Sequence, residues 1–243
     1  MLGTFLNTAA ILGAGLAGLW RAPDPPLRWQ KRLSAGLGVL TLALGFHVVW
    51  RAASETPGSA MRVVGLALLA FFLGRWTGGL LRLQQGLNRL GRFSGRVLTG
   101  NETSPAGDTG SEVFAAATVV FCLTPLAVVG PLLEALGGDA RALMLKAGMD
   151  GLAALALARS RGGGVVLAAL PVLAFQGTLT LLLGAAKPWL AGFHGDDLLR
   201  ATAGLVLWPV ALVMLQVARV RLADYLPALL WAPMLGWWLR PSC

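Results

Sequence analysis

Long apolar runs recur from one end of this sequence to the other, and they constrain the fold more than any other feature. A transmembrane α-helix needs about 20 consecutive, mostly apolar residues. Of the 243 residues, 56% are hydrophobic and only 13% are charged. Soluble domains are about 45–50% apolar and about 25% charged. The chain is therefore predicted to be an all-α polytopic membrane protein, with residues 1–243 forming a single transmembrane domain.

Eight segments are long and apolar enough to be predicted as membrane spans. The fifth and the eighth are the least regular, because they contain charges or prolines. The first lacks the basic start of a signal peptide, so we expect it to be retained as a span. The predicted spans are residues 3–20, 33–50, 61–81, 113–133, 140–158, 164–186, 201–217 and 222–239.

The basic residues predict the orientation in the membrane. With eight spans, twelve Lys and Arg residues fall on one side and seven on the other. Cytoplasmic loops carry an excess of Lys and Arg, so the first side is predicted to be cytoplasmic and both termini extracytoplasmic. The net charge of +9 is spread over short clusters between apolar runs. A nucleic-acid-binding protein gathers its cations on one soluble face, so we expect no nucleic-acid partner.

The segment after the third span has an amphipathic pattern. Leu83, Leu87 and Leu90 recur at helical spacing, and Arg89 lies on the opposite face. Residues 82–112 are therefore predicted to form an amphipathic helix on the cytoplasmic surface, followed by a flexible loop. The loop is expected from residue 94 onward, where Gly, Ser, Thr and Asp become frequent.

The last three predicted spans resemble the first three in order and spacing. QGTLTLL in the sixth span aligns with GAGLAGL in the first. AGLVLWPVAL from Ala203 aligns with AGLGVLTLAL from Ala35, and ALLWAPMLG from Ala228 aligns with LALLAFFLG from Leu66. Five crossings precede the sixth span, so the second triplet would cross the membrane in the opposite direction to the first. This predicts inverted-topology repeats, as in many secondary transporters, which bind substrate near the membrane midplane between the repeats.

The repeat prediction divides the domain into four parts. Two repeats of three helices flank a central pair of helices, which contains a broken helix. The predicted parts are repeat A at residues 1–81, the amphipathic helix and loop at 82–112, the central helix pair at 113–160 and repeat B at 161–243.

Five ordered motifs carry a family resemblance. They are MLGTFLNTAAILGAGLAG, FCLTPLAVVGPLLEAL, KAGMDGLAALALA, PVLAFQGTLTLL and DYLPALLWAPML. Together they resemble the bacterial membrane-protein family called domain of unknown function 554. The resemblance covers essentially the whole chain. It implies a multi-pass protein of the bacterial plasma (inner) membrane, in a family grouped with transporters and without an established substrate.

The resemblance also singles out individual residues. By the family pattern, Asn7 matches the asparagine of the first span, and Lys146 and Asp150 with Gly151 match the lysine and the Asp-Gly pair of the fifth. Gln176 and Gly177 match the Gln-Gly of the sixth span. The chain departs from the pattern in having Thr124 before Pro125, where the family usually has glycine, and in lacking an acidic residue near Gly79.

Asp150 is the strongest candidate for a binding residue. It lies near the middle of the fifth predicted span, and ionisable residues inside membranes usually face a cavity, a partner or a transport pathway. Asp150 could bind a cation or carry a proton. The alternative is a structural ion pair with Lys146, one helical turn earlier, or with Arg75 in the third span. Lys146 could also extend along its helix to the membrane surface.

Arg75 is surrounded by small residues in FFLGRWTGGLL. Gly74, Gly78 and Gly79 at this spacing predict close approach of a second helix. Arg75 is expected either to pair with Asp150 or to reach the cytoplasmic interface.

Prolines predict breaks in two spans. Pro125 and Pro131 each remove an intrahelical hydrogen bond from the fourth span, and Pro171 does so in the sixth. A helix broken inside the membrane exposes backbone groups that can bind an ion or a carboxylate. Thr124 and Pro125 are therefore candidate binding residues. The alternative is a set of kinked but otherwise ordinary spans.

Uncharged polar residues gather in the first and sixth spans. Asn7 and Thr8 lie in one, and Gln176, Gly177 and Thr178 in the other. If the repeats are real, these residues cluster at the pseudo-symmetry axis and contribute to a binding site. The alternative is ordinary hydrogen bonding between helices.

No motif for soluble enzyme chemistry is present. The sequence has no P-loop, no G-x-S-x-G, no H-E-x-x-H and no paired cysteine motif. We expect no catalytic residue, no metal site and no cofactor, and predict that the protein is not an enzyme.

The leading prediction is a secondary transporter or permease for a small solute or ion, with Asp150 as the binding or coupling acid. The alternatives are a channel and a non-transporting scaffold or membrane enzyme. Expected partners are the lipid bilayer, the solute or ion, and a second copy in a homodimer.

Overall fold

The computed structural model describes residues 1–20, 26–54, 60–99, 110–192 and 195–239. Within these residues every regular element is helical, which confirms the predicted all-α class. The elements are α1 (Leu2–Leu19), α2 (Leu27–Ser54), α3 (Ala60–Leu80), α4 (Leu83–Thr99), α5 (Gly110–Cys122), α6 (Leu126–Gly137), α7 (Arg141–Arg161), α8 (Gly164–Leu167), α9 (Ala169–Ala191), α10 (Gly195–Met214), the 3-10 helix η1 (Leu222–Tyr225) and α11 (Ala228–Trp238).

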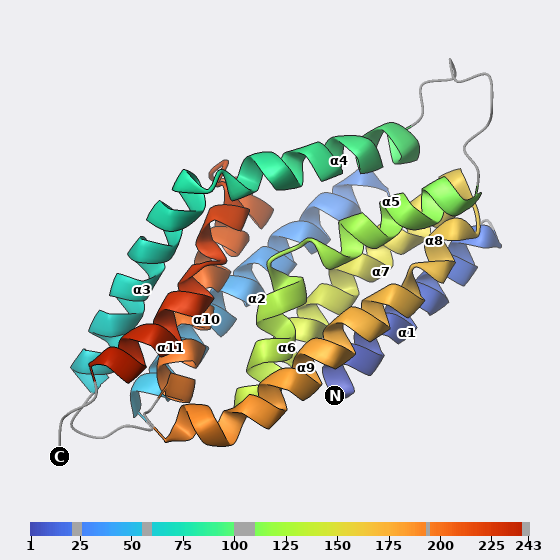
Figure 1. The fold of residues 1–243 in the computed structure, drawn as a ribbon. Helices are drawn as coiled ribbons and strands as arrows, with labels where there is room; N and C mark the ends of the chain where they lie inside the picture. The colour runs from blue at the N-terminus through green and yellow to red at the C-terminus, as the bar shows by residue number, and fades with distance from the viewer. Residues whose placement is uncertain (21–25, 55–59, 100–109, 193–194, 240–243) are drawn as a thin grey trace.

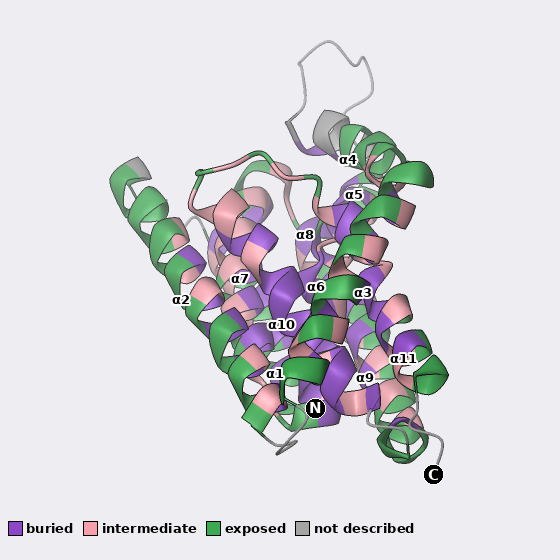
Figure 2. Ribbon diagram, turned by 90° about the vertical axis from the view of Figure 1, so that its left-hand side faces the viewer, coloured by how far each residue is buried: buried purple, intermediate pink, exposed green. Residues whose placement is uncertain are grey.

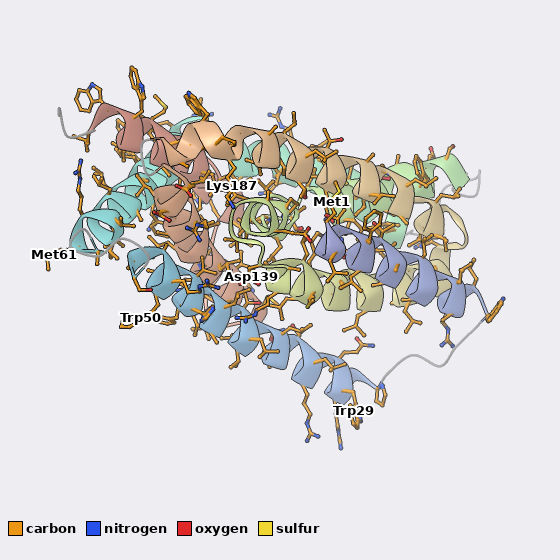
Figure 3. The ribbon with its side chains drawn as sticks, turned by 90° about the horizontal axis from the view of Figure 1, so that it is seen from below. Met1, Trp29, Trp50, Met61, Asp139 and Lys187 are labelled. Carbon is orange, nitrogen blue, oxygen red and sulfur yellow. The ribbon has the colours of Figure 1, made fainter. Side chains whose placement is uncertain are left out.

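The long helices form one bundle in which consecutive elements alternate in direction (Figure 1). α1, α3, α7 and α10 run toward one end, and α2, α5 with α6, α9 and α11 run back. α2 packs against α10, α3 packs against α11, and α1 packs against both α7 and α9. Seen from below, α6 lies in the middle of the bundle, and Met1 and Asp139 lie close to it (Figure 3).

Fewer helices than the predicted eight are long and apolar enough to cross a membrane. Five candidate spans qualify in the described residues: α1, α2, α3, α8 with α9, and α10. α5 and α6 qualify together as a sixth, bent by 54°. The predicted fifth span is the 21-residue α7, which carries five charged residues, and the predicted eighth is divided into η1 and the 11-residue α11. The count of eight is not confirmed.

The fourth span breaks where Pro125 predicts, and the sixth span is interrupted slightly earlier than its proline. The fourth span breaks at residues 123–125, next to Pro125, but α6 continues through Pro131 without interruption. At Pro131 the alternative of an unbroken span applies. The sixth span is interrupted at Ala168, three residues before Pro171. A proline ring clashes with the carbonyl of the residue four positions earlier, so Pro171 disturbs the helix at Leu167 while itself continuing into α9.

Buried residues lie inside the bundle and exposed ones outside it (Figure 2). Many of the exposed side chains are large and apolar. One apolar core joins α2, α3, α6, α10 and α11, and a second joins α1, α5, α7 and α9. Trp50, Trp76 and Trp237 are among the large apolar side chains left exposed on the outside. Soluble proteins rarely expose so much apolar surface to water. The apolar exterior therefore fits contact with lipid.

Glycines set the closest helix contacts, as the sequence predicts for α3. A Cβ added to Gly74 would collide with Ala228, and one added to Gly78 would collide with the backbone of Asp224. Gly79 lies in open space and contributes nothing to this contact. α3 can therefore approach η1 and α11 at backbone distance only because Gly74 and Gly78 have no side chain.

α4 is the predicted amphipathic helix. It lies across one end of the bundle, between the end of α3 and α5 (Figure 1). Arg82, with φ of 51°, makes the turn between α3 and α4. α4 extends to Thr99, so the helix is longer and the following loop shorter than predicted. Residues 100–109 of the predicted loop lie outside the described part.

Candidate functional site

The centre of the site is the break between α5 and α6. In an α-helix the carbonyl of Phe121 would accept a hydrogen bond from the backbone nitrogen of residue 125, but Pro125 has no N–H. Lys146 supplies the missing donor, with its Nζ 2.9 Å from the Phe121 oxygen. An ammonium group from α7 therefore satisfies the backbone acceptor that the proline leaves free.

Lys146 also forms a buried ion pair with Asp150. Its Nζ lies 2.5 Å from Asp150 Oδ2, and the two residues are one turn apart on α7. Lys146 is 1% exposed and Asp150 is 6% exposed. The alternative that Lys146 extends to the membrane surface is thus wrong: its side chain points inward to Phe121 and Asp150.

An amide from α1 contacts Asp150 and links it to a second amide, from α9. Asn7 Nδ2 donates to Asp150 Oδ2 and to Gln176 Oε1, both at 3.2 Å. Asn7 and Gln176 are completely buried. The structure therefore brings together four residues that the sequence singled out, from three helices far apart along the chain.

Several buried polar atoms in this cluster and at the break between α5 and α6 have no partner in the described part of the chain. Among the described residues, Asn7 Oδ1, Gln176 Nε2 and Thr124 Oγ1 have no hydrogen bond. Asp150 uses Oδ2 for both of its hydrogen bonds. Because buried polar groups in proteins are nearly always hydrogen-bonded, atoms of this kind call for an explanation such as water or a ligand.

A second buried acid, Glu134, was not among the predicted site residues. Its carboxylate accepts a hydrogen bond from the backbone N–H of Gly3 at 2.7 Å and from the hydroxyl of Thr4 at 3.4 Å. Glu134 thus anchors the start of α1, where the helix dipole favours an anion. Leu143 fills the space beside these residues, and a Cβ added to Gly3 or Gly130 would collide with it. A carboxylate within an apolar run was the sequence signal for Glu134.

The other predicted residues are not gathered in this cluster. Thr8 donates to the carbonyl of Thr4 within its own helix, 2.9 Å away. Thr178 is on the exposed face of α9, and Gly177, beside the buried Gln176, is only half-buried. Arg75 is exposed, with its guanidinium 5.8 Å from the ring centre of Tyr225. The predicted pairing of Arg75 with Asp150 is absent among the described residues; the interfacial alternative fits its position better.

Comparison with known proteins assigns the chain to a family. The family model described as "Protein of unknown function (DUF554)" matches residues 2–237. The chain belongs to the DUF554 family. The resemblance read from the five sequence motifs is thereby confirmed.

Two curated relatives resemble this DUF554 protein over nearly their whole length. "Uncharacterized membrane protein YdfK" of Bacillus subtilis is 25% identical over 237 residues, which cover 96% of this chain and 95% of YdfK. "Uncharacterized protein YqgA" of Escherichia coli is 26% identical over 239 residues, covering 98% of this chain and 97% of YqgA. No solved structure matches the chain. The name of YdfK and the apolar helices together support a membrane protein.

Proposed function

We propose that this DUF554 protein is a secondary transporter or permease for a small solute or ion, with Asp150 as the binding or coupling acid. One observation carries the proposal: a buried Lys146–Asp150 ion pair is attached to a helix break, through the Phe121 carbonyl. Ionisable residues placed in this way within membrane proteins mark substrate and ion pathways more often than they serve packing alone.

Energetics argue that the ion pair is kept for a purpose other than stability. Removing two charges from water costs several kcal/mol per ion, and replacing a buried pair with apolar residues is often neutral or stabilising. α7 is packed in an interior of leucine, valine and alanine that could accept such residues. The chain nevertheless has Lys146 and Asp150 at these positions. This fits a role in which one of the two charged groups exchanges its partner during transport.

The free polar atoms describe what a substrate would meet. Asn7 Oδ1 can accept a hydrogen bond, Gln176 Nε2 can donate, and the Thr124 hydroxyl can do both. Together with a carboxylate and an ammonium, this set suits a small polar solute or a cation.

The bundle supports an eight-crossing, inverted-repeat arrangement as part of the same proposal. The elements paired by the sequence repeat lie against each other: α1 with α9, α2 with α10, and α3 with α11. Each pair is antiparallel (Figure 1), as a two-fold axis in the membrane plane requires. In this proposal α7 crosses the membrane with its Lys146 and Asp150 charges turned inward, and η1 with α11 forms the eighth crossing.

Orientation follows from the positive-inside bias. The end with α4 carries the larger share of basic residues, so we place it in the cytoplasm of a bacterial cell, at the inner membrane, with the termini outside.

A mechanism follows from the position of Lys146 between the acid and the break. A proton or cation that binds Asp150 neutralises the charge that holds Lys146 on that side. The Lys146 ammonium would then keep only its hydrogen bond to the Phe121 carbonyl. Its position would shift, and the angle between α5 and α6 would change as a result. Occupancy of Asp150 is thereby coupled to the bend of a membrane-crossing segment, which is the element that such a transporter needs.

The test is solute-driven flux in reconstituted vesicles. Proteoliposomes loaded with a pH-sensitive dye would be challenged with pools of amino acids, organic acids, sugars and monovalent salts. Asp150→Asn is expected to abolish coupled movement. Because it leaves the buried Lys146 ammonium without its carboxylate, flux is compared per amount of folded protein in the vesicles. Asp139→Asn, the same change in the turn before α7, keeps a hydrogen-bond acceptor for Arg141 N–H and is expected to leave flux intact.

Other outcomes would replace the proposal. A channel would conduct in both proteins, with selectivity altered in Asp150→Asn. A scaffold would show no flux in any pool, and Asp150→Asn would change only its assembly.

A further inference from the structure

A second polar site lies apart from the Lys146–Asp150 cluster. A cavity of about 400 Å³ opens between the end of α3, the segment after α10 and η1. Three arginines, Arg75, Arg219 and Arg221, line it together with Asp224 and Tyr225. The transport proposal uses none of these residues.

The charges of this basic pocket do not cancel. Three guanidinium groups face one carboxylate, and that carboxylate is already engaged. Asp224 Oδ1 accepts the backbone N–H of Gln84 at 3.2 Å, and Oδ2 lies 3.9 Å from Arg221 Nε. Asp224 therefore orients Arg221 and fastens η1 to the first turn of α4, while the pocket as a whole stays positive.

Arg75 has a stacking contact, and the guanidinium donors of the pocket stay available. Arg75 lies over the ring of Tyr225, a position that fixes a guanidinium without using its N–H groups. The Arg219 and Arg221 side chains are exposed. Gly79 also lines the cavity, and the space beside it is open: a Cβ added there would meet nothing within 4 Å.

We propose that the basic pocket binds a phosphate group. Guanidinium groups present paired N–H donors that match the oxygens of a phosphate, and clusters of arginine are the common protein solution for binding this anion. Two of the three arginines come from one short segment and the third from a different helix, so the donors converge on the cavity from two sides.

The setting of the pocket favours a phospholipid as the source of that phosphate. The pocket adjoins the start of the amphipathic helix α4, through Gln84 and Asp224. Amphipathic helices with a basic face lie at the level of the lipid headgroups. Basic pockets beside transmembrane helices on the cytoplasmic side bind anionic headgroups. A free phosphate or phosphorylated solute has the same chemistry, and the experiment must separate the two sources.

Binding to the purified protein in a neutral detergent tests the proposal. The probes are phosphatidylglycerol, with phosphatidylcholine as the neutral lipid, and sodium phosphate, with sodium chloride at equal ionic strength. Native mass spectrometry reports bound lipid and the thermal midpoint reports stabilisation by either probe. The variant Arg219→Gln/Arg221→Gln removes two exposed cations, which leaves the buried core unchanged.

The matched control removes the same charge elsewhere. Arg89 and Arg92 are exposed on α4, so Arg89→Gln/Arg92→Gln tests whether surface charge alone matters. Arg75→Lys keeps the charge but loses the paired donors. We expect the pocket variant to weaken binding by about tenfold or more, Arg75→Lys to weaken it by less, and the α4 variant to bind as the wild type does.

The outcomes separate the two sources and overturn the proposal if it is wrong. Binding of phosphatidylglycerol without stabilisation by sodium phosphate assigns the site to a lipid headgroup. Stabilisation by sodium phosphate alone, lost in the pocket variant, assigns it to a free phosphate. Unchanged binding in the pocket variant, or an equal loss in the α4 variant, contradicts the proposal. None of these results depends on transport activity.

Discussion

The ammonium group of Lys146 donates a hydrogen bond to the backbone carbonyl of Phe121, at 2.9 Å. That carbonyl has no helical donor, because the residue one turn later is Pro125. One side chain thus joins a buried carboxylate to a break in a neighbouring helix pair. The bend of α5 against α6 and the ion pair of α7 are therefore parts of a single arrangement.

Removing Lys146 should be costly, and removing both partners of the ion pair should not. Lys146→Met leaves Asp150 as a buried charge without its cation, which is expected to lower stability by about 3–5 kcal/mol. Lys146→Met/Asp150→Leu should recover most of this loss and have no coupled flux. Thermal unfolding in detergent measures the first effect and vesicle flux the second.

Lys187→Met is the matched control, because Lys187 is exposed on α9. Its stability should stay within about 0.5 kcal/mol of the wild type. A double variant that remained as unstable as Lys146→Met would contradict the role assigned to the pair.

Restoring the donor at residue 125 should straighten the break. Pro125→Ala provides an N–H for the Phe121 carbonyl in place of Lys146, and a proline inside a helix costs about 3 kcal/mol. We expect a more stable protein with reduced flux, measured by the thermal midpoint and the vesicle assay. Pro131→Ala makes the same change inside the continuous α6 and should affect flux much less. Equal loss of flux in both variants would show that the break has no special role.

The sequence predicted the individual polar residues better than their partners. Asn7, Lys146, Asp150 and Gln176 stood out because polar groups are rare in apolar spans. Their meeting depends on which helices are neighbours, and apolar sequence carries little information about that. Lys146 is the clearest case: its distance from the span end allowed a surface position, yet the acceptor that draws it inward is a backbone carbonyl of α5.

Some secondary-structure elements were predicted correctly and others were not. Apolar content predicted the helical class, and the spacing of apolar residues predicted the amphipathic α4. The break in the sixth span was misplaced, since a proline disturbs the turn before it and not its own position. Glu134 was not among the predicted site residues. Its role depends on the backbone of Gly3, more than a hundred residues away in the chain.

Adjacent glycines of α3 should respond in opposite ways to the same substitution. A Cβ at Gly78 would collide with the backbone of Asp224, which cannot rotate away, so Gly78→Ala is expected to cost about 1–3 kcal/mol. Gly79 faces open space, and Gly79→Ala should be neutral or stabilising by up to about 1 kcal/mol. Thermal unfolding of the two variants side by side measures the difference. Equal effects would contradict the close packing of α3 on η1.

If the proposed function is correct, the break between α5 and α6 lines a polar site that water reaches inside the membrane. Reaction of single cysteines with a membrane-impermeant, charged thiol reagent tests it most directly, after Cys122 and Cys243 are replaced by alanine. Thr124→Cys lies at the break, with its native hydroxyl buried and unpaired in the described structure, whereas Thr178→Cys lies on the exposed side of α9, which we propose to face lipid. We expect Thr124→Cys to react and Thr178→Cys to remain unmodified. Absence of reaction at Thr124→Cys, whatever Thr178→Cys does, would contradict the proposed function.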